Sequence, residues 1–375
     1  MNAVLYFLAT NGQRVVFAAT LVLLLLAPVP GLVMTPAMAD GGKSKPAVPP
    51  LRVVASFSVL ADMVAEVGGE RVAVRALVGA GQDSHVYRPT PRDLREVARA
   101  HLVIVNGAGF EGWLERLVRA SGYDGEVVAA TDGLTLRRLG EGHGEHGAQS
   151  HVEHERRHVD EHRASPAANS ARAKGHDSHG HSSPSHGQAS LSEHTLDPHA
   201  WHDPRLAVRY VENIRRALVR ADPHGGPNYN ERAQRYTEQI RILYGRLREQ
   251  MNKVDVHTRT IITPHDGFAY MEDAFGLEIL PMASTSPEGE ASAAHMARIA
   301  RAVSDHTVRA IFAESTSNMR MIAQVASNTG AVHGGILYAD ALSTPDGPAP
   351  SYLGLLRHNV TTLIKALSRK TGDKP

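Results

Sequence analysis

The sequence predicts an α/β protein with two βα sandwich domains, each built on a parallel sheet, joined by one long helix. Apolar, strand-like runs alternate with helix-spaced segments both before residue 228 and after residue 254. The stretch 228–254 contains no proline, one glycine and apolar residues at helical spacing. As a helix it would be about 40 Å long, which suits a connector between two domains.

The elements of each domain follow from this alternation. The first domain is expected over 51–226 and the second over 255–375, with 227–254 as the linking helix. Strands are expected at 51–58, 72–78, 102–107 and 125–130, then at 260–265, 277–282, 310–315 and 334–340. Helices are expected at 60–67, 94–98, 112–120 and 204–221, then at 266–275, 293–305, 318–329 and from Tyr352 onward.

The N-terminus predicts export. Residues 15–26 form a compact apolar stretch behind the single positive charge of Arg14, and Ala37-Met38-Ala39 has the small-x-small pattern of a cleavage site. We therefore expect a signal peptide over 1–39, a linker over 40–50, and a soluble protein in the periplasm of a double-membrane bacterium. A permanent membrane anchor is the alternative.

Composition excludes several classes of site. The chain has no cysteine, so it has neither disulfides nor thiolate metal ligands. Lys+Arg 40 against Asp+Glu 39 leaves it almost neutral, and no basic block with interleaved aromatic residues appears, so we expect no nucleic-acid partner.

A histidine-rich insertion over 140–196 interrupts the first domain. It is poor in apolar residues, so we expect it to be disordered. Imidazole is a common neutral ligand for Zn²⁺, so the tract is expected to collect metal, and below about pH 6 it would become cationic. Eleven of the 22 histidines of the chain lie in it: His143, His146, His151, His154, His158, His162, His176, His179, His181, His186 and His194.

Four residues outside the insertion are candidate metal ligands. His85 lies in the loop after the second strand, and His199 lies just before a helix. His265 and Asp340 end two predicted strands of the second domain. Strand ends and interdomain clefts are favoured positions for small ligands. Three imidazoles and one carboxylate complete a tetrahedral Zn²⁺ shell and leave no open position for a catalytic water.

Each candidate histidine has an acidic neighbour in the sequence: Asp83, Asp197 or Asp266. Such carboxylates can accept the second ring N–H of a metal-bound histidine and fix its tautomer. The alternative is that they cap helices, and for Asp266 both interpretations stay open.

The motifs DSHVYRPTP, DPHAWHDP, TPHDGFAYM, SPEGEAS and LYADALS occur in this order. Together they resemble the zinc/manganese-specific periplasmic solute-binding proteins of ABC metal importers, over nearly all of 51–368. The insertion falls where zinc-specific members carry theirs. The resemblance implies two βα domains joined by a long helix, with a metal ion in the cleft between them.

Carried onto matching positions, the resemblance implies ligation by His85, His199, His265 and Asp340. Manganese-type members usually have a carboxylate at the position of His265, so the histidine favours Zn²⁺ over Mn²⁺. Glu314 is expected to orient the cleft, and Asp346 competes with Asp340 as fourth ligand. His202 departs from the apolar residue common there; it is an auxiliary ligand or, as we expect, a solvent-facing side chain.

These expectations define a periplasmic zinc-binding protein that captures Zn²⁺ and delivers it to an ABC permease of the inner membrane. We expect a monomer and no enzymatic activity, since no expected helix carries an H-E-x-x-H motif and the expected shell is full. The alternatives are a manganese or iron importer subunit of the same fold, and a His-rich periplasmic zinc buffer or chaperone.

Overall fold

The computed structural model describes residues 49–139, 196–283, 299–303, 305, 308–316, 322, 326 and 331–369. The expected signal peptide, most of the expected linker, the His-rich insertion and most of the helix expected at 318–329 lie outside the described residues.

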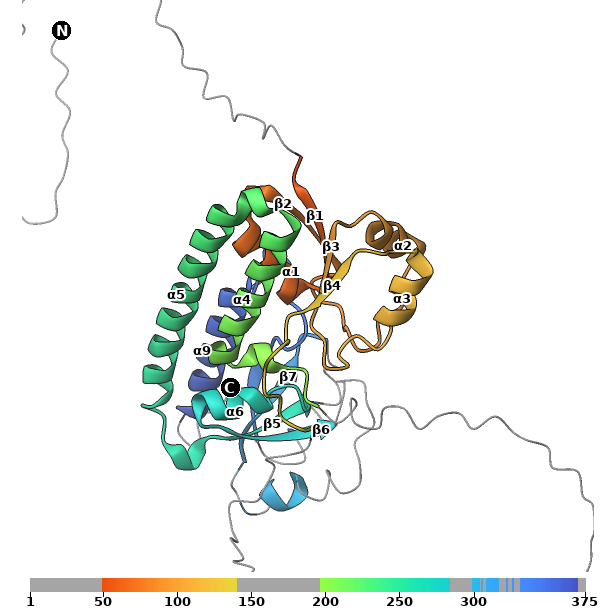
Figure 1. Cartoon of the computed structure of the whole chain (residues 1–375). Coiled ribbons are helices and arrows are strands. Elements are labelled where there is room, and N and C mark those ends of the chain that lie inside the picture. The colour runs from red at the N-terminus through yellow and green to blue at the C-terminus, as the bar shows by residue number, and fades with distance from the viewer. Residues whose placement is uncertain are drawn as a thin grey trace, which may run out of the picture. The chain divides into compact units, whose positions relative to one another are not determined.

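The first half of the chain forms a four-stranded parallel sheet of order β2-β1-β3-β4 (Figure 1). All four residues of β3 are buried, as the continuous apolar run required. The strands are β1 (Leu51–Phe57), β2 (Val72–Val78), β3 (Leu102–Val105) and β4 (Glu126–Ala129). The helices are α1 (Ser58–Gly68), α2 (Pro91–Ala98), α3 (Leu114–Ser121) and α4 (Pro204–Ala221).

Local capping explains where two of these helices begin. The side chain of Thr90 accepts a hydrogen bond from the backbone N–H of Asp93, and the carboxylate of Asp93 accepts one from the backbone N–H of Thr90. Pro91 is the first helical residue of α2. At the start of α4, Asp203 accepts from the N–H of Arg205, and Pro204 again follows the cap. These caps fix the ends of the loops that carry His85 and His199.

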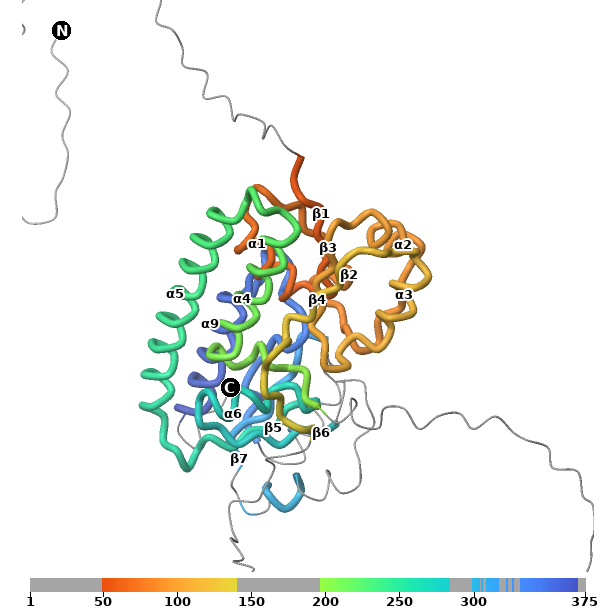
Figure 2. Tube along the Cα trace, viewed as in Figure 1, coloured from red at the N-terminus to blue at the C-terminus, as the bar shows by residue number. Residues whose placement is uncertain are grey.

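The long helix α5 (Gly226–Met251) matches the predicted connector within three residues at each end. Its buried side chains recur every three or four residues from Tyr229 to Ile240 and face the neighbouring helices. It packs against α4, α1 and α9 (Tyr352–Leu367), and Figure 2 shows it running alongside α4 and α9. The helix therefore contacts elements from both halves of the chain.

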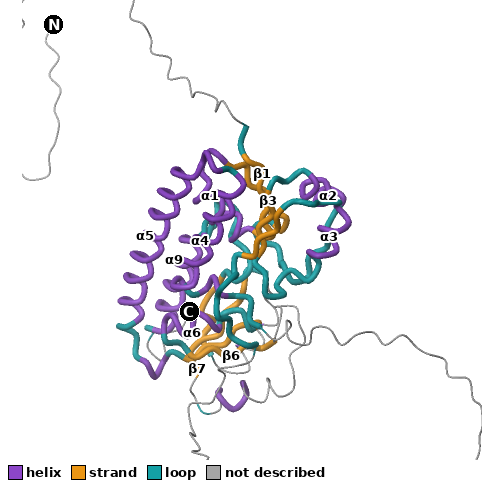
Figure 3. The backbone as a smooth tube through the Cα atoms, viewed as in Figure 1, coloured by secondary structure: helices purple, strands orange, loops and turns teal. Residues whose placement is uncertain are grey.

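The second half repeats the first sheet, with the parallel order β6-β5-β7-β8. Figure 3 shows β6 and β7 of this sheet in orange. Its strands are β5 (Thr260–His265), β6 (Glu278–Ala283), β7 (Val308–Glu314) and β8 (Val332–Leu337), and α6 (Ala269–Phe275) follows β5.

The predicted end of the last strand is wrong. The strand expected over 334–340 spans Val332–Leu337. The side chain of Asn359 on α9 accepts from the backbone N–H of Tyr338 at 2.9 Å and donates to its carbonyl at 2.7 Å. Because α9 takes both backbone groups, Tyr338 cannot continue the sheet, and Asp340 lies in the loop beyond it.

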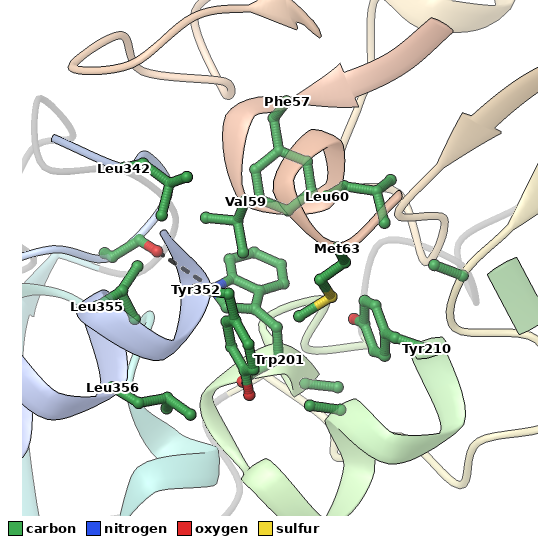
Figure 4. Close-up of a cluster of buried hydrophobic side chains, with 14 of the residues drawn as sticks. Phe57, Val59, Leu60, Met63, Trp201, Tyr210, Leu342, Tyr352, Leu355 and Leu356 are labelled. Atoms are coloured by element: carbon green, nitrogen blue, oxygen red, sulfur yellow. Dashed lines mark hydrogen bonds between the residues drawn. The ribbon is translucent and has the colours of Figure 1, made fainter. Parts of the chain in front are cut away.

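One hydrophobic cluster spans both halves, and Trp201 lies within it (Figure 4). The Trp201 indole N–H donates to the carbonyl of Ala339 at 3.2 Å, and the Tyr352 hydroxyl donates to the carbonyl of Trp201 at 2.8 Å. The side chains of Phe57, Leu60 and Met63 pack around it from the first half. Among the described residues, no helix has the length and apolar character to cross a membrane.

Candidate metal centre

Each candidate ligand lies where a strand or loop meets the junction of the two sheets. His85 follows β2, and His199 directly precedes a 3₁₀ turn, Ala200–His202. His265 is the last residue of β5, and Asp340 comes three residues after β8. Because the strands are parallel, their carboxyl ends gather at one edge of each sheet, and the four side chains meet there.

The geometry of the cluster fits a single small cation. Nε2 of His85 lies 3.3 Å from Nε2 of His199 and 3.5 Å from Oδ2 of Asp340. Nε2 of His199 and Nε2 of His265 are each 3.5 Å from an Asp340 carboxylate oxygen, and all four ligand atoms lie within 4.8 Å of one another. Tetrahedral bonds of about 2.0–2.1 Å separate ligand atoms by about 3.4 Å, so the spacing matches a zinc-sized shell.

The cluster is almost sealed from solvent. The side chains of His199, His265 and Asp340 are 1%, 0% and 2% exposed, whereas that of His85 is 16% exposed. A pocket of about 220 Å³ opens beside His85 and His199. Leu139 and Leu196, the last described residue before the His-rich stretch and the first one after it, both line this pocket.

Two buried polar atoms in the cluster make no hydrogen bond within the described part of the chain: Nε2 of His265 and Oδ1 of Asp340. Leaving such atoms unsatisfied costs about 1–3 kcal/mol each. A cation bound among the four side chains would satisfy both, and this is the strongest local indication of a metal site.

Two carboxylates orient the imidazoles from behind. Nδ1 of His199 lies 2.7 Å from Oδ1 of Asp197, and Nδ1 of His265 lies 2.7 Å from Oε2 of Glu314. Both contacts leave the Nε2 atoms facing the cluster. Glu314, at the end of β7, thus takes the orienting role expected for it.

Asp83 is not the ring partner of His85, and of the two interpretations left open for Asp266 the ring-partner one is wrong. Asp83 accepts from the backbone N–H of His85 at 2.7 Å rather than from its ring, because the loop turns back on itself there. Nδ1 of His265 is already paired with Glu314, so Asp266 is not its ring partner. The pairing of β5 with β7 brings Glu314, the last residue of β7, beside His265, the last residue of β5.

The buried charges act on one another. Burial would raise the pKa of Asp340, but the imidazoles of His265, His85 and His199 outweigh it and hold the pKa well below its usual range. Burial would lower the pKa of His265, but the charges of Glu314 and Asp340 outweigh it and raise the pKa to about 9. At neutral pH the metal-free cluster therefore carries a proton on His265 that a metal ion must displace.

The expected solvent exposure of His202 is also wrong. Its ring is fully buried and packs against Phe268, with ring centroids 4.8 Å apart, and against Trp201 at 5.5 Å. Burial lowers the pKa of His202 to about 3, so the ring is neutral. Its backbone lies in the 3₁₀ turn that follows His199, which directs the side chain into the core. Asp346 is exposed and outside the four-residue cluster.

A sealed cluster of three imidazoles and one carboxylate suits the holding of an ion better than the activation of a substrate on it. Two similar parallel-sheet halves that each contribute two of its side chains make the chain a two-lobed metal-binding protein. The chain belongs to the family described as zinc-uptake complex component A, periplasmic, whose model matches residues 53–366. Members of this family are solute-binding proteins that deliver metal to ABC permeases, and they are not enzymes.

Known relatives handle different metals. The chain is 27% identical to the iron-binding protein YfeA of Yersinia pestis, covering 90% of this chain and 93% of the relative. It is 27% identical to the manganese-binding lipoprotein MntA of Halalkalibacterium halodurans, covering 85% and 89%. The Mn-bound periplasmic metal-binding protein of Candidatus Liberibacter asiaticus is 29% identical, with a TM-score of 0.65 over 84% of this chain and 99% of that one.

Proposed function

We propose that this protein is a periplasmic zinc-binding protein that captures Zn²⁺ and delivers it to an ABC permease of the inner membrane. The observation that carries the proposal is the third imidazole: His265, held by Glu314, joins His85 and His199 around one aspartate. Zn²⁺ accepts nitrogen ligands in tetrahedral geometry, whereas Mn²⁺ prefers more oxygen ligands. The 3.3–3.5 Å spacing of the ligand atoms supports the same choice.

Capture would begin at His85. It is the only ligand with appreciable exposure, and it lines the pocket between Leu139 and Leu196. The His-rich insertion that joins these two residues would hold zinc weakly and raise its local concentration at the pocket. We further propose cleavage of residues 1–39 on export, a monomeric protein, and lobes over 51–226 and 255–375 joined by 227–254.

Release would require the two halves to separate. His85 and His199 belong to the first half, and His265 and Asp340 to the second, so moving the halves apart breaks the shell. The long helix α5 packs on both halves and would limit this movement. Docking on the permease would supply the force.

The first experiment is a competitive titration of the protein lacking residues 1–39 with Zn²⁺, Mn²⁺ and Fe²⁺, with and without residues 143–194. We expect one zinc site of nanomolar or tighter affinity that survives the deletion and with which equimolar Mn²⁺ and Fe²⁺ do not compete. Loss of tight binding with the insertion would instead identify a His-rich zinc buffer.

The second candidate is an iron or manganese importer subunit, which the names of YfeA and MntA favour. A variant that carries both His265→Glu and Glu314→Gln separates the two functions, since it exchanges an imidazole of the shell for a carboxylate and removes the charge of the neighbouring Glu314. We expect its preference to shift toward Mn²⁺. Equal competition by Mn²⁺ in the unmodified protein would contradict the zinc assignment.

A further inference from the structure

Asn106 is a buried polar residue that links the first sheet to the segment before the metal ligand His199 by hydrogen bonds. It follows β3 and is 0% exposed. Its side-chain N–H₂ donates to the carbonyl of Pro198 at 2.9 Å, and the hydroxyl of Tyr210 donates to its Oδ1 at 2.8 Å. The amide nitrogen therefore faces Pro198, because the opposite orientation would place two acceptors against each other.

The backbone of Asn106 is held as firmly as its side chain. Its N–H donates to the carboxylate of Glu111 at 2.6 Å, and its carbonyl accepts from the hydroxyl of Thr131 at 2.7 Å. All of its polar groups are thus bonded inside the protein, and such a fully satisfied network has one favoured arrangement.

The bond to Pro198 reaches a metal ligand directly, since His199 is the next residue. The carbonyl of Asp197, one residue earlier, accepts from the Tyr270 hydroxyl at 2.8 Å. The two peptide groups that precede His199 are therefore anchored from different sides, one by Asn106 of the first half and one by Tyr270 of the second.

Two of the residues after Asn106, Ala108 and Gly109, line the pocket beside His85 and His199. Gly107, Ala108 and Gly109 adopt φ values of +87°, +54° and +77°, an unusual run that includes a non-glycine residue. Glu111 stabilises the run by accepting also from the N–H of Gly107 at 3.1 Å. These three residues place the ring of Phe110 in a T-shaped contact with the ring of His85, with ring centroids 4.9 Å apart.

We propose that Asn106 is a positioning residue for the metal cluster: it sets the place of His199 through the Pro198 carbonyl and, through the loop that follows it, the packing of Phe110 on His85. The proposal rests on the proposed function, because it takes the four-residue cluster as the zinc site. Asn106 itself contacts no ligand atom; it acts through the backbone of the ligand segment.

The test compares Asn106→Asp with Asn213→Asp. Asn213 on α4 is also buried and also donates its side-chain N–H₂ to backbone carbonyls, those of Ala130 and Asp132, but it does not reach the ligand segment. Each variant is titrated with Zn²⁺ against a chelator, the Co²⁺-loaded protein is examined by visible absorption, and unfolding of the metal-free protein is followed in urea.

We expect both variants to lose stability, but only Asn106→Asp to lose 10–100-fold in zinc affinity and to shift the Co²⁺ absorption bands. Equal zinc affinities and unchanged Co²⁺ spectra in the two variants would overturn the proposal. If Asn106→Asp does not fold, Tyr210→Phe is used instead, because it removes the hydroxyl that donates to Oδ1 of Asn106. A loss of zinc affinity smaller than 10-fold in this variant supports the proposal, and wild-type affinity contradicts it. A wild-type protein without a tight cleft site would refute the proposed function instead.

Discussion

At the scale of residues, two imidazole–carboxylate pairs determine the chemistry of the cluster. Asp197 is local to His199, whereas Glu314 reaches His265 from the neighbouring strand. Each pair fixes one tautomer and raises the basicity of the Nε2 atom that faces the cluster. The outer carboxylates should therefore matter for affinity although neither belongs to the four-residue cluster.

Replacing Glu314 by glutamine should weaken zinc binding by roughly 10–100-fold, because a neutral amide supports the His265 ring less well than a carboxylate does. Affinity is measured by competition with a chelator of known strength. Glu278→Gln is the matched control: it lies in the same sheet and accepts from the Thr260 hydroxyl at 2.8 Å, away from the cluster. The prediction fails if both variants bind zinc alike.

The raised pKa of His265 makes the stability of the metal-free protein depend on pH. The folded protein holds this proton up to about pH 9, whereas an unfolded histidine releases it near pH 6.5. The proton on His265 therefore contributes on the order of 1–3 kcal/mol to the free energy of unfolding. This contribution is complete below pH 6.5 and is lost as the pH rises to 9. Urea unfolding of chelator-treated protein at both pH values measures it. His265→Gln should flatten this slope; an unchanged slope would assign it to other groups.

At the scale of elements, loop conformation and strand ends place the site. The last strand ends at Leu337 because the side chain of Asn359 bonds both backbone groups of the next residue, Tyr338. The loop that begins there places Asp340 in the cluster. In the first half, the left-handed run that follows Asn106 turns the chain sharply after β3. Both features lie where a strand ends and the chain leaves the sheet.

Gly107→Ala should destabilise the protein by about 1–3 kcal/mol. A methyl group there would meet the Thr131 hydroxyl at 2.8 Å and the Ala129 side chain at 2.9 Å, in addition to the strain of a φ of +87°. Gly122→Ala, with a φ of +69° and no atom within 4 Å, reports the conformational cost alone, about 1 kcal/mol. Urea unfolding compares the two variants, and equal losses would show that crowding at Gly107 is relieved.

At the scale of the whole molecule, the two halves share a core and a ligand shell. Trp201 of the first half bonds to Ala339, and Tyr352 of the second half bonds back to Trp201. The shell takes two side chains from each half. A bound ion would therefore act as a cross-link between halves, stabilising the folded protein through its affinity for the native state alone.

Zinc at 100 times its dissociation constant should stabilise the protein by about 2.7 kcal/mol, seen as a higher melting temperature. Asp340→Ala removes the one carboxylate of the shell and should abolish most of this increase. Asp346→Ala removes an exposed aspartate six residues away and should keep the full increase. If the second variant lost the response, the fourth ligand would be Asp346.

The order of strands and helices along the chain and the long connector could be predicted from the sequence, because they depend on local signals, namely apolar periodicity and turn residues. The four side chains of the cluster could be predicted from polar residues at strand ends and in loops, together with the family resemblance of the motifs around them. Four features required the packed structure: Glu314 supports His265, His202 is buried, Asn359 ends the last strand, and Asn106 holds the segment before His199. Each of these joins residues far apart in the chain, and such contacts exist only once the elements have packed.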